Sequence, residues 1–307
     1  MDDANALILT SGGIRQLWIV KTMLESEPFR NYIDTCDHIL GTSAGALAGV
    51  LLALYSERAG LNRVSKALHR PHVDDSLFTI FTKLILNREI LPVKTIEDSL
   101  RCAIYEVLDR SRNTNDDTVT FTKTLVVGLI KHPNDTSVYE EKIFEKNTTY
   151  KVDDVVHTVA ASASILGFTK SKYGSDGAEA HAFPVHAARN LSGRVVVICP
   201  YPEREMMTPR FIQNTGWFAP FRMLLNSLGY TELMMKVGDD VRELAKRTHI
   251  ICPEEYVAPR ALYCLTDKQQ ADLTKCATHM AQALAQALAQ AVPQAFNEAH
   301  VWDLLRL

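Results

Sequence analysis

Residues 38–55 read HILGTSAGALAGVLLALY. His38-Ile39-Leu40 predicts a short buried strand, which Gly41 interrupts. Every residue from Ala44 to Tyr55 is small or apolar, and a helix that is apolar on all sides lies in a core rather than on a surface. A strand followed directly by a turn and a buried helix is typical of the parallel βαβ units of α/β proteins.

Other segments extend this pattern on both sides. Ala6–Leu9 predicts a buried strand, and apolar residues recur at helical spacing from Ile14 to Leu24. Farther along, Val119–Ile130 and Ser137–Phe144 predict two strands that pair with each other, and Val195–Cys199 predicts a last buried strand. The expected fold class is therefore α/β, with a mainly parallel central sheet.

The rest of the chain predicts helices. Helical patterns cover residues 61–110 and Asp153–Ser164, and no further strong strand is expected after Cys199. The alanine-rich stretch 267–291 predicts a helix that docks onto the body of the protein. A dimer seam and a membrane-surface helix are the alternatives for that stretch.

The domain organisation follows from the absence of a linker-like or low-complexity stretch. We expect a single domain over residues 1–307, since a chain of this length can bury one large core. The α/β core would occupy about residues 5–200, and a helical C-terminal layer would occupy about residues 203–307.

Composition excludes several classes of protein. The chain has 33 Lys and Arg residues against 36 Asp and Glu residues, a formal net charge of −3, which argues against a nucleic-acid-binding protein. The acidic start differs from a secretory signal, and the longest apolar run is too short to span a bilayer. Six scattered cysteines without a C-x-x-C pair indicate neither a zinc site nor a disulfide framework. We therefore expect reduced thiols in a cytoplasmic protein.

The first chemical motif lies inside the opening stretch. Gly41-Thr42-Ser43-Ala44-Gly45 is a G-x-S-x-G sequence between a predicted strand and a predicted helix, the context of a nucleophile elbow. Flanking glycines relieve the crowding of such a turn, and the helix N-terminus favours negative charge at Ser43. The alternative is a serine that merely caps the helix in a glycine turn.

A second glycine turn, Ser11-Gly12-Gly13-Ile14-Arg15, also joins a predicted strand to a predicted helix. Successive backbone N–H groups in such a turn can converge on an oxyanion, as acyl transfer requires. The stretch fits neither a dinucleotide loop nor a phosphate loop, since G-x-G-x-x-G and G-K-[ST] are both absent.

A third motif, Asp176-Gly177-Ala178, could supply a carboxylate base to Ser43. Asp-Gly is also a common turn dipeptide, so an ordinary turn is the alternative.

Together the three motifs resemble the patatin-like phospholipase family, which carries a glycine-rich oxyanion turn, a G-x-S-x-G nucleophile and a D-G-[GA] motif. The resemblance runs from about Leu7 to Val197, and includes softer matches at Ala160–Ser164 and Phe183–Val185. The chain departs from the family at Ser11 and Gln16, where the family has glycines. We expect an intact oxyanion hole on a loop that is stiffer or differently shaped.

The resemblance implies a three-layer α/β/α fold and a lipid acyl hydrolase of the phospholipase A type with a Ser-Asp dyad. Ser43 would attack the ester carbonyl and Asp176 would take its proton. The backbone N–H groups of Gly12, Gly13 and Ile14 would hold the oxyanion.

The resemblance also bears on ligands and partners. Arg15 would steady the oxyanion loop or meet a lipid phosphate. The chemistry needs no metal or organic cofactor. The substrate would be a phospholipid or a related lipid ester, reached by peripheral contact with a membrane, and a homodimer is compatible with the alanine-rich helix.

Two other functions stay open at this point. A catalytically weak binding or regulatory module is suggested by Ser11 and Gln16. A histidine-dependent esterase would use His181, His186 or His249, which follow Asp176 in the chain. Only two strands are predicted up to Ser43, which are too few for the α/β-hydrolase fold that carries Ser-Asp-His triads.

Two apolar segments could meet lipid, residues 75–92 and residues 217–225. Either could line the mouth of the site or act as a lid, and Gly216 and Pro220 make the second the better lid candidate. Core packing is the alternative for both segments.

Overall fold

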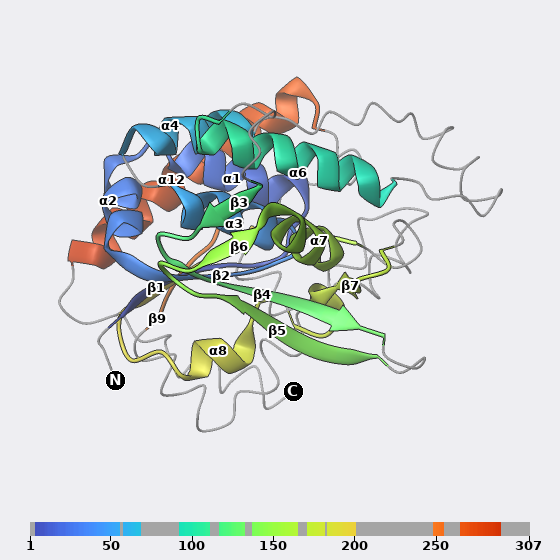
Figure 1. Ribbon diagram of the computed structural model, residues 1–307. Helices are drawn as coiled ribbons and strands as arrows, with labels where there is room; N and C mark the ends of the chain where they lie inside the picture. Colours follow the sequence, from blue (N-terminus) through green and yellow to red (C-terminus); the bar gives the residue numbers. More distant parts are fainter. Residues whose placement is uncertain are drawn as a thin grey trace, which may run out of the picture.

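The computed structural model describes residues 4–55, 58–68, 92–110, 117–132, 137–164, 171–181, 183–200, 248–254 and 265–289. Within these residues a central sheet has the strand order β5-β4-β2-β1-β8-β9, with β7 paired to β4 (Figure 1). The strands of this sheet are β1 (Asn5–Leu9), β2 (Cys36–Thr42), β4 (Thr124–Lys131), β5 (Val138–Phe144), β7 (Ser175–Asp176), β8 (Val195–Ile198) and β9 (Thr248–Ile251).

The centre of this sheet is parallel. β1 pairs in parallel with β2 and β8, β2 with β4, and β8 with β9, while β5 and β7 run antiparallel to β4. Strands covered on both faces read as continuous apolar runs, and all four residues of β8 are buried. The prediction of a mainly parallel sheet in an α/β protein is confirmed.

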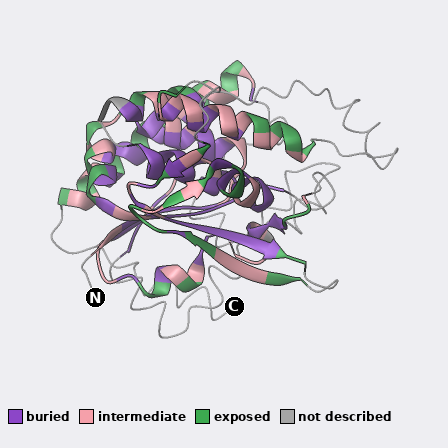
Figure 2. Ribbon diagram, in the orientation of Figure 1, coloured by how far each residue is buried: buried purple, intermediate pink, exposed green. Residues whose placement is uncertain are grey.

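Helices cover both faces of the sheet and make the fold three-layered. Figure 1 shows α1 (Ile14–Met23), α3 (Ala44–Leu54), α7 (Val152–Ser162) and α12 (Asp267–Ala289) on one side, and α8 (Val185–Arg189) on the other. On the first side lie also α2 (Glu27–Thr35), α4 (Arg58–Ala67) and α6 (Val93–Val107). The burial colouring in Figure 2 places α3 in the interior beneath these outer helices.

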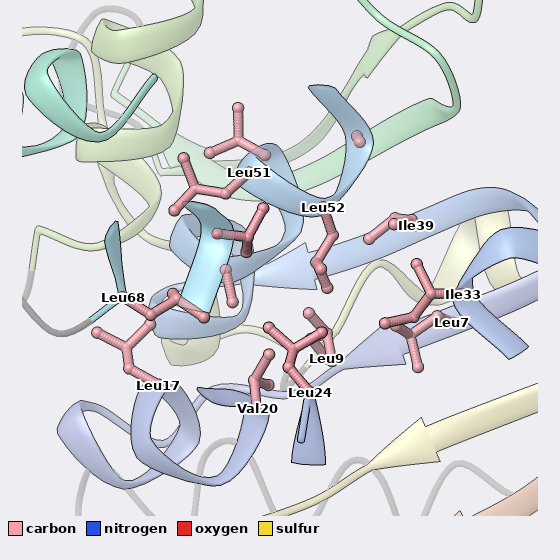
Figure 3. Close-up of a cluster of buried hydrophobic side chains, with 14 of the residues drawn as sticks. Leu7, Leu9, Leu17, Val20, Leu24, Ile33, Ile39, Leu51, Leu52 and Leu68 are labelled. Atoms are coloured by element: carbon pink, nitrogen blue, oxygen red, sulfur yellow. The ribbon is translucent and has the colours of Figure 1, made fainter. Parts of the chain in front are cut away.

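The larger core lies between the sheet and α3. Figure 3 shows Leu7 and Leu9 of β1, Val20 of α1 and Leu52 of α3 together in this cluster. A smaller cluster on the other face packs β-strand residues against α8, with Ala188 fully buried. The all-apolar sequence of α3 therefore reflects a helix enclosed by the sheet and the outer helices.

Two sequence predictions about strands are corrected. Thr248–Ile251 forms β9 at the edge of the sheet, whereas no strand was expected after Cys199. Its first two residues, Thr248 and His249, are polar, so the segment lacks the continuous apolar run of β8, and pairing with β8 stabilises it as a strand. The segment Val119–Ile130 is not one strand but two. Its first part belongs to β3 (Thr118–Thr120), which pairs with β6 (Thr149–Lys151) in a separate small sheet.

Other predictions hold. β4 and β5 pair antiparallel, as expected for Val119–Ile130 and Ser137–Phe144. Helix α12 docks onto the body, where Met280 and Leu284 are buried and Trp18 Nε1 donates to Thr274 Oγ1 at 3.0 Å. Among the described residues, no helix is both long and apolar enough to cross a membrane. Residues 75–91 and 217–225, proposed to meet lipid, lie outside the described residues.

Candidate active site

Ser43 sits at a sharp turn between β2 and α3. Its backbone torsions are φ 57° and ψ −126°, a region that L-residues with a side chain rarely occupy. Such a conformation typically costs about 1–3 kcal/mol and persists only where the surroundings impose it. The turn places Ser43 directly before the first residue of α3, at the positive end of the helix.

The glycines on either side of Ser43 are required by close backbone approaches. A Cβ on Gly41 would lie 2.5 Å from the carbonyl oxygen of Gly45, and a Cβ on Gly45 would lie 2.0 Å from that of Leu9. Both contacts involve main-chain atoms, which cannot move aside as a flexible side chain can. Glycine is therefore required at both flanking positions of the G-x-S-x-G motif, because the main chain leaves no room for a side chain there.

Asp176 meets Ser43 at this turn. Ser43 Oγ donates a hydrogen bond of 2.7 Å to Asp176 Oδ2, and both side chains are buried, with exposed fractions of 7% and 4%. Asp176 ends β7, which pairs with β4 so that Asp176 stands opposite Leu129. The other carboxylate oxygen, Oδ1, accepts a bond of 2.8 Å from the Ala178 N–H. One oxygen is thus held by the backbone while the other faces the serine.

Gly177 allows the chain to turn tightly after Asp176. A Cβ at this position would lie 2.3 Å from the carbonyl oxygen of Gly128 in β4. The turn continues into the short 3-10 helix η2 (Gly177–Glu179), which Asp176 caps. The Asp-Gly turn is therefore packed directly against the strand next to β2.

The glycine turn after β1 leaves the same edge of the sheet. β1 and β2 are parallel neighbours with Leu9 opposite Gly41, so the turns that follow them emerge side by side. Gly13 has φ 57° and ψ −146°, and a Cβ on Gly12 would lie 2.3 Å from Pro200 Cγ. No described residue accepts a hydrogen bond from the Gly12 or Gly13 N–H. That these N–H groups hold an oxyanion stays a prediction of the sequence.

Gln16, one of the two departures from the family pattern, has a structural contact. It is fully buried in the first turns of α1, and its Nε2 donates to the carbonyl oxygen of Ile198 at 3.3 Å. The Thr10 N–H reaches the same carbonyl at 3.3 Å. Gln16 therefore links α1 to β8 by a hydrogen bond beneath the glycine turn.

The other two polar residues of this turn are less exposed than surface residues. Arg15 is buried, and Ser11 is half-buried at the start of the turn.

Gln16→Ala is expected to lower the free energy of unfolding by about 2–3 kcal/mol, because it removes a buried side chain and its bond to β8. Chemical denaturation measures this loss. Gln282→Ala, at an exposed position of α12, is the matched control and should change stability by less than about 0.5 kcal/mol. Equal stabilities of the two variants would show that Gln16 does not anchor the turn.

The three candidate histidines make other contacts, although the His181 N–H donates to the carbonyl oxygen of Gly177 at 2.8 Å. His181 packs edge-on against Tyr139 with ring centroids 4.5 Å apart, and His186 lies beside both rings. His249 is on β9, where burial and the nearby positive charge of Arg194 lower its pKa. In the described part of the chain, none of the three forms a hydrogen bond with Ser43.

Sequence reasoning missed one residue at the site. Ser162, at the end of α7, accepts a bond of 3.0 Å from the Ser43 N–H through its Oγ. Its segment, Ala160–Ser164, was noted in the sequence as a softer match to the small-residue stretch of the family, with no role given to Ser162. That run was the available signal, since small residues at a helix end permit close packing against a neighbouring turn.

Solved structures with detectable similarity are distant. VipD from Legionella pneumophila is 13% identical, with a TM-score of 0.44, and the match covers 93% of this chain and 67% of VipD. The type III effector protein ExoU is 12% identical, with a TM-score of 0.44 and coverages of 99% and 61%. In its complex with SpcU from Pseudomonas aeruginosa, ExoU is matched at 13% identity and a TM-score of 0.44, covering 94% of this chain and 53% of ExoU. The chain thus spans about half to two thirds of these proteins.

No curated protein sequence matches this chain significantly. Residues 7–189 match the family model described as patatin-like phospholipase, a span that covers more than half of the chain. The span includes the glycine turn after β1, the Ser43 turn and Asp176. This match confirms the family resemblance of the sequence, and it indicates hydrolysis of lipid esters as the general activity. The chain belongs to the patatin-like phospholipase family.

Proposed function

We propose that the chain is a lipid acyl hydrolase of the phospholipase A type that uses Ser43 as nucleophile and Asp176 as general base. The observation that carries this proposal is the 2.7 Å hydrogen bond from Ser43 Oγ to Asp176 Oδ2 in a buried setting. A nucleophile and a base within hydrogen-bond distance are the requirement for this kind of catalysis. The family supports the substrate class, a lipid ester.

The first half of the reaction acylates the enzyme. Ser43 Oγ attacks the ester carbonyl while its proton moves to Asp176 Oδ2, forming a tetrahedral intermediate. The N–H groups of Gly12 and Gly13, with Ile14, would stabilise the oxyanion. As the intermediate collapses, the bond to the leaving oxygen breaks and Asp176 returns the proton to it. The products are an alcohol, such as a lysophospholipid, and an acyl ester on Ser43.

The second half releases the acid. Asp176 takes a proton from a water molecule, whose oxygen attacks the acyl carbonyl. Collapse of the second intermediate breaks the bond to Ser43 Oγ, which recovers its proton from Asp176. The free carboxylic acid leaves and the starting state is restored. Each step uses residues of this chain alone.

The structure supports this assignment in two further ways. Oδ1 of Asp176 is held by the Ala178 N–H, so the carboxylate keeps a fixed orientation towards Ser43. Ser43 stands at the N-terminus of α3, where the helix dipole favours negative charge on its oxygen. Peripheral membrane contact, a homodimer, a single domain and a cytoplasmic location stay predictions of the sequence.

The experiment that tests the proposal combines labelling with product detection. The native protein is expected to react with a fluorophosphonate probe at Ser43 and to release fatty acid from phosphatidylcholine vesicles. Probe attachment is located by peptide mass spectrometry, and heat-denatured protein is the control. A folded protein that neither takes up the probe nor releases fatty acid would contradict the proposal and favour a binding module.

A further inference from the structure

One turn of the chain contacts both members of the proposed catalytic pair. At the end of α7, Ser162 Oγ accepts the hydrogen bond from the Ser43 N–H at 3.0 Å. Two residues later, the carbonyl oxygen of Ser164 accepts a bond of 2.9 Å from the Asp176 N–H. The nucleophile and the base, 133 residues apart in sequence, are thus held by the same short segment.

The Ser162 hydroxyl makes a second contact, with β4. It donates a bond of 2.6 Å to the carbonyl oxygen of Gly128. Gly128 stands opposite Thr42, the residue before the nucleophile, and its carbonyl lies against Gly177, the residue after the base. A single buried hydroxyl therefore connects the serine turn with the strand that supports the aspartate turn.

Ser43 needs such a connection because its backbone conformation is strained. Its N–H precedes the helix and takes no partner from the hydrogen bonds of α3. Without Ser162 Oγ, this buried N–H and the Gly128 carbonyl would each lose a partner. The turn could then rotate to recover hydrogen bonds, and Ser43 Oγ would move away from Asp176.

We propose that Ser162 is a positioning residue that fixes the Ser43 turn relative to Asp176. Its hydroxyl hydrogen-bonds to the Ser43 N–H and the Gly128 carbonyl, and it acts through the backbone of Ser43. This inference rests on the proposed hydrolase function, and it adds to that function a third residue, on which the geometry of the pair depends.

Ser164 supplies a matched control. Its side chain is as buried as that of Ser162, and its Oγ donates to the carbonyl oxygen of Ala160 in α7 at 2.7 Å. It holds Asp176 with its main-chain oxygen, which a Ser164→Ala substitution keeps. The two alanine variants therefore remove equally buried hydroxyls from the same turn, and only one of them releases the Ser43 backbone.

The experiment compares wild type, Ser162→Ala and Ser164→Ala on a soluble carboxylic ester, together with the rate of fluorophosphonate labelling. Ser162→Ala is expected to lower kcat and the labelling rate about 10- to 100-fold with KM within about twofold, because a small misplacement of the nucleophile slows chemistry more than binding. Ser164→Ala is expected to keep both rates within about threefold of wild type. Unchanged rates in Ser162→Ala, or equal losses in both variants, would overturn the proposal.

Amide hydrogen exchange provides a readout that does not depend on activity. Exchange in the peptide containing Ser43 is expected to accelerate about tenfold or more in Ser162→Ala and to stay unchanged in Ser164→Ala. If the wild type is inactive but the variants show this exchange pattern, the proposed hydrolase function is overturned and the positioning role of Ser162 is kept. If the wild type is active but exchange near Ser43 does not accelerate in Ser162→Ala, only the positioning role is overturned. If Ser162→Ala does not fold, Ser162→Cys replaces it, because a thiol forms only weak hydrogen bonds. Ser162→Cys is expected to show the same loss of kcat, and a wild-type kcat in this variant would overturn the proposal.

Discussion

Asp176→Asn is expected to reduce ester hydrolysis by about 10³- to 10⁴-fold while the fold is kept. Asparagine has nearly the same shape as aspartate, and its side-chain oxygen can still accept the Ala178 N–H. Its amide group cannot take a proton from Ser43, so the base is lost without disturbing the turn. Initial rates of fatty acid release from phospholipid vesicles, with circular dichroism to check folding, measure the effect.

Controls for this variant separate the proposed dyad from the histidine alternative. Ser43→Ala should abolish fluorophosphonate labelling, since the reactive oxygen is gone. His181→Gln, His186→Gln and His249→Gln should each keep activity within about threefold, because none of these side chains bonds to Ser43. A histidine variant that loses activity while Asp176→Asn retains it would overturn the dyad.

Gly45→Ala is expected to abolish folding, or to cost more than about 4 kcal/mol of stability, a range reserved for severe structural conflicts. The added Cβ would lie 2.0 Å from the carbonyl oxygen of Leu9 and 2.8 Å from that of Thr10. Both atoms belong to the main chain, in or next to a central strand that is paired on both sides. The conflict can be relieved only by moving α3 away from the sheet. Yield of soluble protein and denaturant unfolding measure the outcome.

Gly49→Ala is the matched control for this variant, one turn farther along α3. A Cβ at Gly49 would approach only side-chain atoms, Ile39 Cγ2 and Leu125 Cδ1, each at 3.3 Å. These methyl groups can shift slightly, and alanine favours the helix over glycine by about 1 kcal/mol. Gly49→Ala should therefore stay within about 1 kcal/mol of wild type. If Gly45→Ala lowered the free energy of unfolding no more than Gly49→Ala does, α3 would not approach β1 as closely as the structure shows.

The parts of the fold that could be predicted from sequence are those whose signals lie in neighbouring residues. The buried character of α3, the strands β1 and β8, and the docking of α12 all follow from local apolar patterns. β9 could not be predicted in the same way, because Thr248 and His249 interrupt its apolar pattern and its strand structure depends on pairing with β8. The division of Val119–Ile130 between two sheets likewise depends on distant pairing with β6 and β5.

The same distinction applies to the candidate site. Glycines at 41, 45 and 177 point to tight turns because the need for glycine arises where the backbone is crowded. The sequence by itself therefore determined which turns are tight enough to carry chemistry, and it predicted Ser43 and Asp176 as the catalytic pair.

Only the tertiary structure decided which groups meet. The distance from Ser43 to Asp176, the contact of Ser162 with the Ser43 N–H and the bond from Gln16 to Ile198 join residues 133, 119 and 182 positions apart. Such contacts are set by the order of strands in the sheet and by the packing of helix ends against it. The residues of a turn are enough to predict that turn. They do not predict which distant groups contact it, because no local sequence pattern encodes the order of the strands.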